Sequence, residues 1–171
     1  MFRIAVTGPE SSGKTTLAAA LNEALVSCFV PEFSRDYFHT KSYLNYTLDD
    51  VISIGKEQFK NNNPSDCDKP FLICDTEMLV IKIWCEDKFG FSPKIVLDLY
   101  EQQQFDLYLI CKPDIPWHYD PLREDENRRE ELYVKYLSNL KESKHNFVEM
   151  EGPLESRIAK ALRLVEQFKQ R

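Results

Sequence analysis

A phosphate-binding motif near the start of the chain constrains the fold more than any other feature. Residues 8–16 read GPESSGKTT, which is a glycine, four residues, and then Gly-Lys-Thr. The apolar run FRIAVT precedes the motif, and leucines and alanines at helical spacing follow it. A P-loop requires this order of strand, loop and helix, whereas a turn with an incidental lysine would not need both flanks. The motif therefore predicts a loop whose backbone N–H groups and following helix N-terminus bind phosphate.

The P-loop interpretation gives the polar side chains of the motif separate roles. We expect Lys14 to contact the outer phosphates of ATP and the Thr15 hydroxyl to hold Mg²⁺. A dinucleotide-binding fingerprint is excluded because position 10 is glutamate, where that fingerprint needs glycine. The residues expected to bind ATP in this segment are Gly8, Glu10, Ser11, Ser12, Gly13, Lys14, Thr15 and Thr16.

The remaining sequence alternates between strand-like and helix-like segments. Apolar runs at residues 27–33, 71–75, 105–111 and 146–152 predict further strands, and amphipathic patterns between them predict helices. This alternation predicts an α/β fold with a mainly parallel five-stranded sheet and helices on both faces. The length of 171 residues suits one domain.

The predicted strand FLICD ends in a carboxylate suited to a magnesium site. Asp75 follows a mostly apolar run, and a carboxylate at this position supports the metal in P-loop enzymes. Asp75 is also suited to cap the next helix, and one side chain can do both. The sequence therefore predicts Thr15 and Asp75 as the protein ligands of Mg²⁺.

Composition excludes several other classes of protein. The net charge is −6, and sequence-independent binding of nucleic acid needs a basic face, so we expect a small-molecule partner and no nucleic acid. The apolar runs are too short to span a membrane, and the first residues lack the pattern of a signal peptide. The five cysteines show no CxxC spacing, which argues against a disulfide framework or a zinc site and predicts a reducing, cytoplasmic setting.

The polar segment at residues 117–133 distinguishes between classes of P-loop protein. Its sequence, WHYDPLREDENRREELY, places Arg123, Arg128 and Arg129 before a helical stretch, whereas the GTPase and ABC-transporter signatures are missing. In small phosphotransferases, arginines on a closing lid neutralise the charge of the transferred phosphoryl group. We expect Arg123 and Arg128 to be catalytic. The alternative is the solvated start of a charged helix, since acids alternate with the arginines.

Five segments of the chain together resemble the ribosylnicotinamide kinase domain of the NadR family. They are GPESSGKT, PEFSRDY, DTE followed by Trp84, PDIPWHYDPLR and EGPLESR, and they occur in that family's order over nearly the whole chain. The resemblance implies a P-loop kinase core with a lid. It also implies an activity, which is phosphorylation of the 5′-hydroxyl of nicotinamide riboside to give nicotinamide mononucleotide.

This sequence departs from the family pattern at three places. Glu77 stands where the family has the second aspartate of Asp-Thr-Asp, and Pro121 stands where the lid has a glycine. The adenylyltransferase and DNA-binding regions of multifunctional NadR proteins are absent from the sequence. The first two departures leave other nucleosides open as acceptors.

Acidic side chains after the second and third predicted strands indicate the chemistry of the acceptor. A nucleoside monophosphate kinase needs several basic residues there, but Arg35 is the nearby cation, so the segment suits an uncharged or cationic acceptor. The pyridinium of nicotinamide riboside could stack on aromatic side chains. Trp84 and Gln58 have ordinary alternatives, which are core packing and a solvated helix position. The expected acceptor-binding residues are Glu32, Arg35, Asp36, Gln58, Glu77, Trp84, Trp117 and Asp120.

Further roles follow from the resemblance. Asp36, in the SRDY segment, is the preferred partner of the acceptor hydroxyl and the candidate general base. Glu77 is the competing candidate, and a salt bridge or helix-start charge is the alternative role for Asp36. In EGPLESR, Pro153 shapes a turn on the adenine side and Arg157 stacks on the base, unless Arg157 is an ordinary exposed helix residue.

The sequence as a whole predicts one P-loop kinase domain over residues 1–171, with a lid at about 114–130. The predicted function is ATP- and Mg²⁺-dependent phosphorylation of a small nucleoside, most specifically nicotinamide riboside. A kinase for another nucleoside stays open, as does a P-loop ATPase that acts as a nucleotide-dependent switch or binding module. The lid arginines and the acidic acceptor segment favour a kinase.

Overall fold

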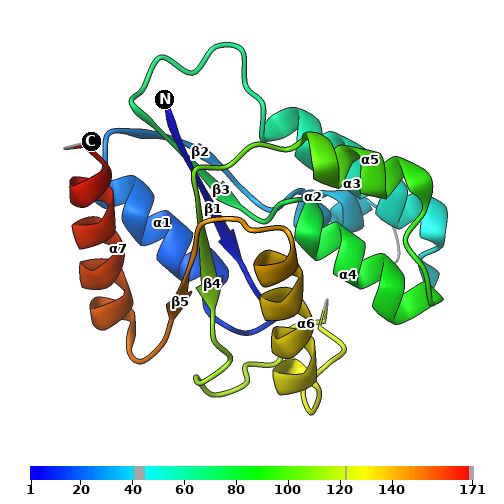
Figure 1. Cartoon of the computed structure of the whole chain (residues 1–171). Helices are drawn as coiled ribbons and strands as arrows, with labels where there is room; N and C mark the ends of the chain where they lie inside the picture. Colours follow the sequence, from blue (N-terminus) through cyan, green and yellow to red (C-terminus); the bar gives the residue numbers. More distant parts are fainter. Residues whose placement is uncertain (41–44, 122, 170–171) are drawn as a thin grey trace.

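A parallel five-stranded sheet forms the centre of the structure (Figure 1). The structure is a computed structural model that describes residues 1–40, 45–121 and 123–169. In these residues the strand order is β2-β3-β1-β4-β5, and each neighbouring pair is parallel. The carboxyl ends of β1, β3 and β4 form a switch point, where open α/β sheets bind ligands. The strands are β1 (Phe2–Thr7), β2 (Ser27–Val30), β3 (Phe71–Asp75), β4 (Leu107–Cys111) and β5 (Phe147–Met150).

Helices cover both faces of this sheet, because successive side chains of a strand point to opposite faces. Ile4 and Val6 of β1 pack with α1 and α7, whereas Ala5 packs with α4 and α6. Helices α3 and α5 pack against α4 (Figure 1). The predicted α/β P-loop fold is confirmed. The helices are α1 (Lys14–Ala24), α2 (Phe33–Thr40), α3 (Leu48–Asn61), α4 (Met78–Phe89), α5 (Lys94–Gln102), α6 (Arg129–Glu142) and α7 (Leu154–Lys169).

Two features of the elements differ from, or add to, the sequence-based expectation. The strand predicted over residues 27–33 ends at Val30, because Pro31 cannot donate to a sheet and α2 begins at Phe33. The predicted lid, residues 114–130, connects β4 to α6 and includes residue 122, which lies outside the described residues. The lid bounds and the single domain over 1–171 stay predictions.

None of the helices in the described ranges is long and apolar enough to cross a membrane.

A disulfide joins Cys28 of β2 to Cys67, which lies in the connection between α3 and β3. The prediction that the cysteines form no disulfide is wrong for this pair. The other three cysteines, Cys74, Cys85 and Cys111, are buried thiols. The pair is separated by 39 residues, and only the fold brings the edge strand and the connection together.

Candidate active site

The P-loop joins β1 to α1 and needs glycine at both of its ends. Gly8 has a φ of 128°, and a Cβ there would lie 2.6 Å from the carbonyl oxygen of Cys111. Gly13 caps the N-terminus of α1 with a φ of 85°. Both values lie in the region that favours glycine. Ser12 Oγ and Lys14 Nζ donate to the carbonyl oxygen of Pro9 at 2.7 and 2.8 Å, which holds the loop in its curled form.

The P-loop lines one side of a cavity of about 190 Å³, to which every residue from Gly8 to Thr16 contributes. The other walls come from the segment around α2, from α4, from the lid and from α6. The cavity therefore brings the predicted ATP-binding motif together with Glu32, Arg35 and Trp84 of the predicted acceptor site. The remaining lining residues are Ser34, Phe38, Val80, Ile83, Asp87, Lys88, Arg123, Glu124, Asp125, Leu132 and Tyr136.

Asp75 ends β3 beside β1 and is 1% exposed. Among the described residues, its Oδ1 has no hydrogen-bond partner. Burial raises the pKa of Asp75 to about 6, the charge of Glu32 adds to the rise, and a hydrogen bond with the Thr15 side chain opposes it. A buried carboxylate is costly unless a cation or proton satisfies it, and oxygen ligands suit Mg²⁺. Asp75 and Thr15 therefore fit a magnesium site.

The wall formed by the start of α2 presents Glu32 rather than Asp36. Glu32 lines the cavity, and Ser34 Oγ donates to its Oε1 at 2.6 Å. Arg35 also lines the cavity, donating to Asp120 Oδ2 at 3.0 Å, and its Nε lies 3.8 Å from Glu32. Asp36 is exposed and lies outside the described residues that line the cavity. The structure does not bring the predicted base Asp36 to the cavity, because α2 turns the neighbouring Ser34 and Arg35 inward instead.

Glu77, the competing candidate base, is completely buried at the N-cap of α4. Its carboxylate accepts hydrogen bonds from Thr7 Oγ1 at 2.8 Å, from Gln103 Nε2 at 2.9 Å and from the backbone N–H of Leu79. Burial raises the pKa of Glu77, and these hydrogen bonds oppose the rise. The predicted acceptor contact is wrong because protein groups enclose the side chain, which fixes the start of α4 against β1.

Gln58 is also completely buried, in the last turn of α3. Its Oε1 accepts from the backbone N–H of Phe33 at 2.8 Å, and its Nε2 donates to Asn62 Oδ1 at 2.9 Å and to the carbonyl oxygen of Pro31 at 3.3 Å. The amide is therefore used within the protein. The prediction that it binds the acceptor is wrong, and it holds the segment that carries Glu32.

One of the two predicted catalytic arginines of the lid reaches the cavity. Arg123 lines it, donates to the carbonyl oxygen of His118, and lies 3.4 Å from Ser11 Oγ. The guanidinium groups of Arg123 and Arg129 lie 5.9 and 5.6 Å from the ring centre of Trp117. Arg129 also donates to the carbonyl oxygen of Ser11 at 3.0 Å. Trp117 lies outside the described cavity lining, so the structure gives it a role in supporting these arginines rather than the predicted acceptor contact.

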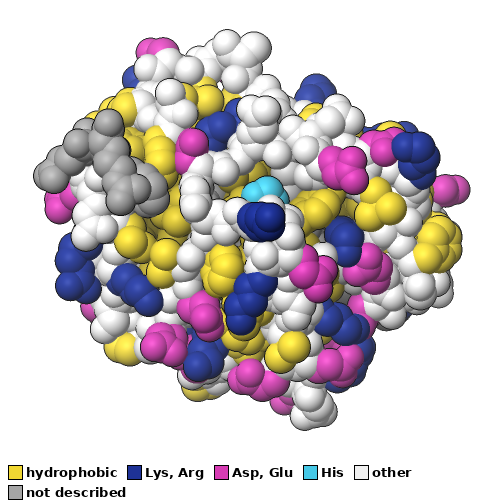
Figure 2. Space-filling view, in the orientation of Figure 1, with side chains coloured by type: hydrophobic (Ala, Val, Ile, Leu, Met, Phe, Trp, Pro, Cys, Tyr) yellow, Lys and Arg dark blue, Asp and Glu magenta, His cyan; other side chains and the backbone are white. Residues whose placement is uncertain are grey.

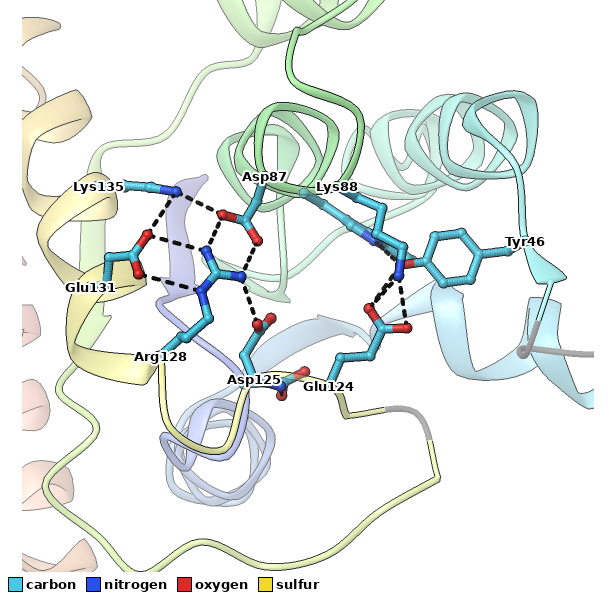
Figure 3. A network of polar contacts seen from close by, with 10 residues as sticks. Tyr46, Asp87, Lys88, Glu124, Asp125, Arg128, Glu131 and Lys135 are labelled. Atoms are coloured by element: carbon cyan, nitrogen blue, oxygen red, sulfur yellow. Dashed lines mark hydrogen bonds and ion pairs between the residues drawn. The ribbon is translucent and has the colours of Figure 1, made fainter.

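Arg128, the second predicted catalytic arginine, is not among the described residues that line the cavity, and it forms ion pairs with three carboxylates, of which Asp87 and Asp125 do line it (Figure 3). Its guanidinium lies 2.6 Å from Asp87 of α4, 3.0 Å from Asp125 of the lid and 3.1 Å from Glu131 of α6. Lys135 pairs with Asp87 and Glu131 as well. The hydrogen bond from Arg128 is the main cause that lowers the pKa of Asp87 to about 2. The structure thus shows Arg128 as a connection between the lid and two helices.

Trp84, a predicted acceptor-binding residue, lines the cavity and belongs to a second connection with the lid through Tyr46. Its Nε1 donates to the hydroxyl of Tyr46 at 2.9 Å. Tyr46 and Lys88 both bind Glu124 of the lid, at 3.2 and 2.9 Å. Sequence reasoning missed Asp87 and Lys88. They follow Trp84 by three and four positions, the spacing at which helical side chains share a face, and this spacing could have identified them.

Arg157 lies under the P-loop and is 2% exposed. Its guanidinium donates to the carbonyl oxygen of Ser12 at 2.7 Å, to that of Gly152 at 2.8 Å, and to the carboxylate of Asp114. A side chain held in this way cannot stack on an adenine, so that prediction is wrong. Pro153, the other residue predicted on the adenine side, is exposed at the turn before α7.

Glu10 is a further unusual group of the cavity wall. Burial raises the pKa of Glu10 to about 7, and a hydrogen bond from the backbone N–H of Asp125 opposes the rise. The contact joins the P-loop to the lid.

On the face shown in Figure 2, Lys and Arg side chains alternate with Asp and Glu rather than gathering in one patch of the described surface.

The sheet order, the curled loop and the carboxylate at the end of the neighbouring strand occur together in P-loop NTPases, and this is the class of the protein. A family model described as an AAA domain matches residues 3–157, and the chain belongs to this family.

Comparison with individual proteins agrees with the predicted resemblance to NadR. The trifunctional NAD biosynthesis/regulator protein NadR of Salmonella typhimurium is 27% identical over 176 residues, which is 96% of this chain and 42% of NadR. The chain thus spans less than half the length of the curated relatives that it matches.

Solved structures share the fold. A NadR protein in complex with NR has a TM-score of 0.76 at 20% identity, over 97% of this chain and 50% of that chain. A NadR protein in complex with NAD and AMP-PNP has a TM-score of 0.78 at 20% identity, over 99% and 50%. A deoxyadenosine kinase from M. mycoides has a TM-score of 0.72 at 16% identity, over 97% and 100%. The protein therefore has the fold of nucleoside kinases.

Proposed function

We propose that this protein transfers the γ-phosphoryl group of ATP to the 5′-hydroxyl of a nucleoside, with nicotinamide riboside as the acceptor. The observation that carries the proposal is the shared cavity, in which Glu32 and Trp84 line the walls opposite the P-loop. A site for hydrolysis alone would not need an acidic and aromatic wall there. The similarity to a NadR protein in complex with NR and to a deoxyadenosine kinase supports the same activity.

Each wall of the cavity has a part in this reaction. The N–H groups of the P-loop and Lys14 bind the outer phosphates, and Mg²⁺ at Thr15 and Asp75 supplies neutralisation of phosphate charge. Glu32 orients the acceptor hydroxyl and accepts its proton, while Arg123 neutralises charge on the transferred group. Because the transition state of phosphoryl transfer is loose, positioning by Glu32 matters more than its strength as a base.

The wall formed by α4 and the lid suits a cationic nucleobase. Trp84 lines the cavity together with the carboxylates of Asp87 and Glu124. A pyridinium ring gains from stacking on an aromatic face by about 0.5–2 kcal/mol, and from nearby negative charge in addition. Lys88 pairs with Glu124 at the same place, which limits the net negative charge until the pair separates.

A coupled assay with ATP, Mg²⁺ and a panel of nucleosides tests this proposal. Nicotinamide riboside should exceed uridine and cytidine in kcat/KM by about tenfold or more, which corresponds to one electrostatic contact of about 1.4 kcal/mol. Lys14→Ala should remove turnover for every acceptor, because it removes a charge that stabilises the transition state. Equal rates for charged and neutral nucleosides would exclude the preference for nicotinamide riboside. ATP hydrolysis without any acceptor product would favour a nucleotide-dependent switch.

A matched pair of variants tests the role of the acceptor carboxylate. Glu32→Gln should lower kcat by about 10²-fold, the lower end of the range for loss of a general base because the amide oxygen still orients the hydroxyl, without a large change in ATP affinity. Asp36→Asn should keep near-normal turnover, because Asp36 is exposed outside the cavity. The reverse result would return the acceptor role to Asp36.

The cytoplasmic location predicted from the sequence belongs to the same proposal. Disulfides are rare in that compartment, so the Cys28–Cys67 bond is the observation that bears against it. Cells are lysed into an alkylating agent under denaturing conditions, and the alkylated cysteines of the protein are counted by mass spectrometry. Five alkylated cysteines would support the cytoplasmic location, whereas three would show that the Cys28–Cys67 bond is present in the cell.

A further inference from the structure

Two buried amide side chains connect the segment before α2 to the end of β3. Gln58 and Asn62, in the last turn and at the C-cap of α3, are 0% and 2% exposed. Gln58 accepts from the backbone N–H of Phe33 at 2.8 Å and donates to Asn62 Oδ1 at 2.9 Å. Asn62 Nδ2 in turn donates to the carbonyl oxygen of Thr76 at 3.2 Å. A continuous chain of hydrogen bonds, which we call the amide relay, therefore runs from the backbone of Phe33 to that of Thr76.

Each end of the amide relay is one residue away from a carboxylate of the site. Phe33 directly follows Glu32, which lines the cavity, and Thr76 directly follows Asp75, which fits the magnesium site. Gln58 and Asn62 are themselves outside the described residues that line the cavity. The amide relay thus fixes the backbone at Phe33 and Thr76. The residues directly before them, Glu32 and Asp75, both have to face the reacting groups in the proposed reaction.

The end at Thr76 has a backbone conformation that needs support. Thr76 has a φ of 85°, a value that a β-branched residue rarely adopts because of steric repulsion. Such conformations persist only where surrounding contacts determine them. The backbone of Thr76 has two of these contacts, since its N–H donates to the carbonyl oxygen of Val6 at 3.2 Å and its carbonyl accepts from Asn62.

We propose that Gln58 and Asn62 are positioning residues that set the placement of Asp75 relative to Glu32, and so couple the magnesium site to the acceptor wall. The part of the proposal that concerns Glu32 rests on the proposed function. The part that concerns Asp75 and Mg²⁺ depends on nucleotide binding alone and can be tested separately.

The test is the effect of Mg²⁺ on the affinity for AMP-PNP, measured by calorimetry with and without the ion. Asn62→Ala breaks both links of Asn62, so the tightening that Mg²⁺ produces should shrink by about tenfold or more, the usual cost of losing a partner that orients a metal ligand. The Kd without Mg²⁺ should stay within about twofold of the wild-type value, because the P-loop contacts are intact. Asn63→Ala is the matched control, since its exposed amide donates to the carbonyl oxygen of Phe59 and accepts from Arg3.

The remaining outcomes decide the proposal as well. A folded Asn62→Ala protein with the wild-type Mg²⁺ effect would overturn it, and so would an equal loss of affinity with and without Mg²⁺, which indicates a merely structural role. If Asn62→Ala does not fold, Gln58→Met removes the other end of the amide relay with a side chain of similar length, and the same criteria apply. A wild-type protein that phosphorylates no nucleoside would refute the proposed function but leave the Mg²⁺ comparison valid.

Discussion

Two arginines near the P-loop are held in opposite ways. Arg157 of α7 is 2% exposed and donates to backbone carbonyl oxygens under the P-loop and to Asp114. The side chain of Arg128, at the start of α6, is 43% exposed and pairs with carboxylates of α4, the lid and α6. Removing a buried, fully bonded charge leaves its partners unsatisfied, whereas exposed ion pairs contribute little.

This difference in burial makes the contacts of Arg157 permanent, whereas the ion pairs of Arg128 can be broken. The cavity, at about 190 Å³, is smaller than the volume of about 300–1,000 Å³ usual for small-molecule sites, so we expect the predicted lid to move outward when nucleotide and acceptor enter. We expect the ion pairs of Arg128, and that of Lys88 with Glu124, to separate in this movement. Arg157 keeps the P-loop in place meanwhile.

The largest effect on stability is expected at the permanent contact. Arg157→Ala should lower the free energy of unfolding by about 3–5 kcal/mol, because Asp114 and the three backbone carbonyl oxygens of Ser12, Lys112 and Gly152 lose a partner. Urea denaturation followed by circular dichroism measures this change. Arg163→Ala, on an exposed position of the same helix, is the control and should change stability by less than about 0.5 kcal/mol. A loss at Arg157 no larger than that of the control would refute the comparison.

A large effect on turnover is expected at the lid arginine that reaches the cavity. Arg123→Ala should reduce kcat by about 10–100-fold and change ATP affinity much less, because the lid closes over charge that develops in the transition state. Steady-state kinetics together with binding of AMP-PNP separates the two quantities. A variant with weakened nucleotide binding and normal kcat would show that Arg123 only binds the ground state.

A smaller, pH-dependent effect is expected at Glu10, which joins the P-loop to the lid. Its pKa is raised from about 4.5 to about 7 in the folded protein, so its favourable contribution is complete below pH 4.5 and is lost as the pH rises through 7. Wild-type protein should therefore lose up to about 1 kcal/mol of stability relative to Glu10→Gln between pH 5 and 8, a value reduced for solvent screening. Parallel pH profiles for the two proteins would contradict the raised pKa.

The smallest effect is expected at the breakable contact. Arg128→Ala should cost about 1 kcal/mol of stability, because the Arg128 side chain is 43% exposed and solvent screens its ion pairs, although its partner Asp87 is only 14% exposed. The difference in Tm from the wild-type protein should shrink further in high salt, which screens exposed pairs. A loss as large as that of Arg157→Ala, insensitive to salt, would show that both arginines are permanent contacts.

The sequence predicted those parts of the site whose placement depends on residues adjacent in the chain. The P-loop follows from glycine, lysine and threonine at fixed spacing between a strand and a helix. Asp75 follows from its place at the end of an apolar run. Trp84 and Glu32 both line the cavity, and their binding of the acceptor stays a prediction.

Partners distant in the sequence decided the residues that were assigned wrongly. Arg157 binds the backbone of Ser12, which is 145 positions away, and no local pattern reveals that contact. Glu77 is enclosed by Thr7 and Gln103 from other elements. Asp36 illustrates a further cause, because the direction in which α2 faces depends on the packing of the helix and not on its composition.

The Cys28–Cys67 bond joins the two ends of the segment that carries the proposed acceptor residues. The two Cα atoms are 6.1 Å apart, and the segment between them carries Glu32, Arg35 and both amides of the relay. A segment with its ends already joined can vary in length at little entropic cost, since loop closure depends only weakly on length. We therefore expect residues 29–66 to be exchangeable for the corresponding segment of a relative, provided that the two amides of the relay are kept so that the placement of Asp75 is unchanged.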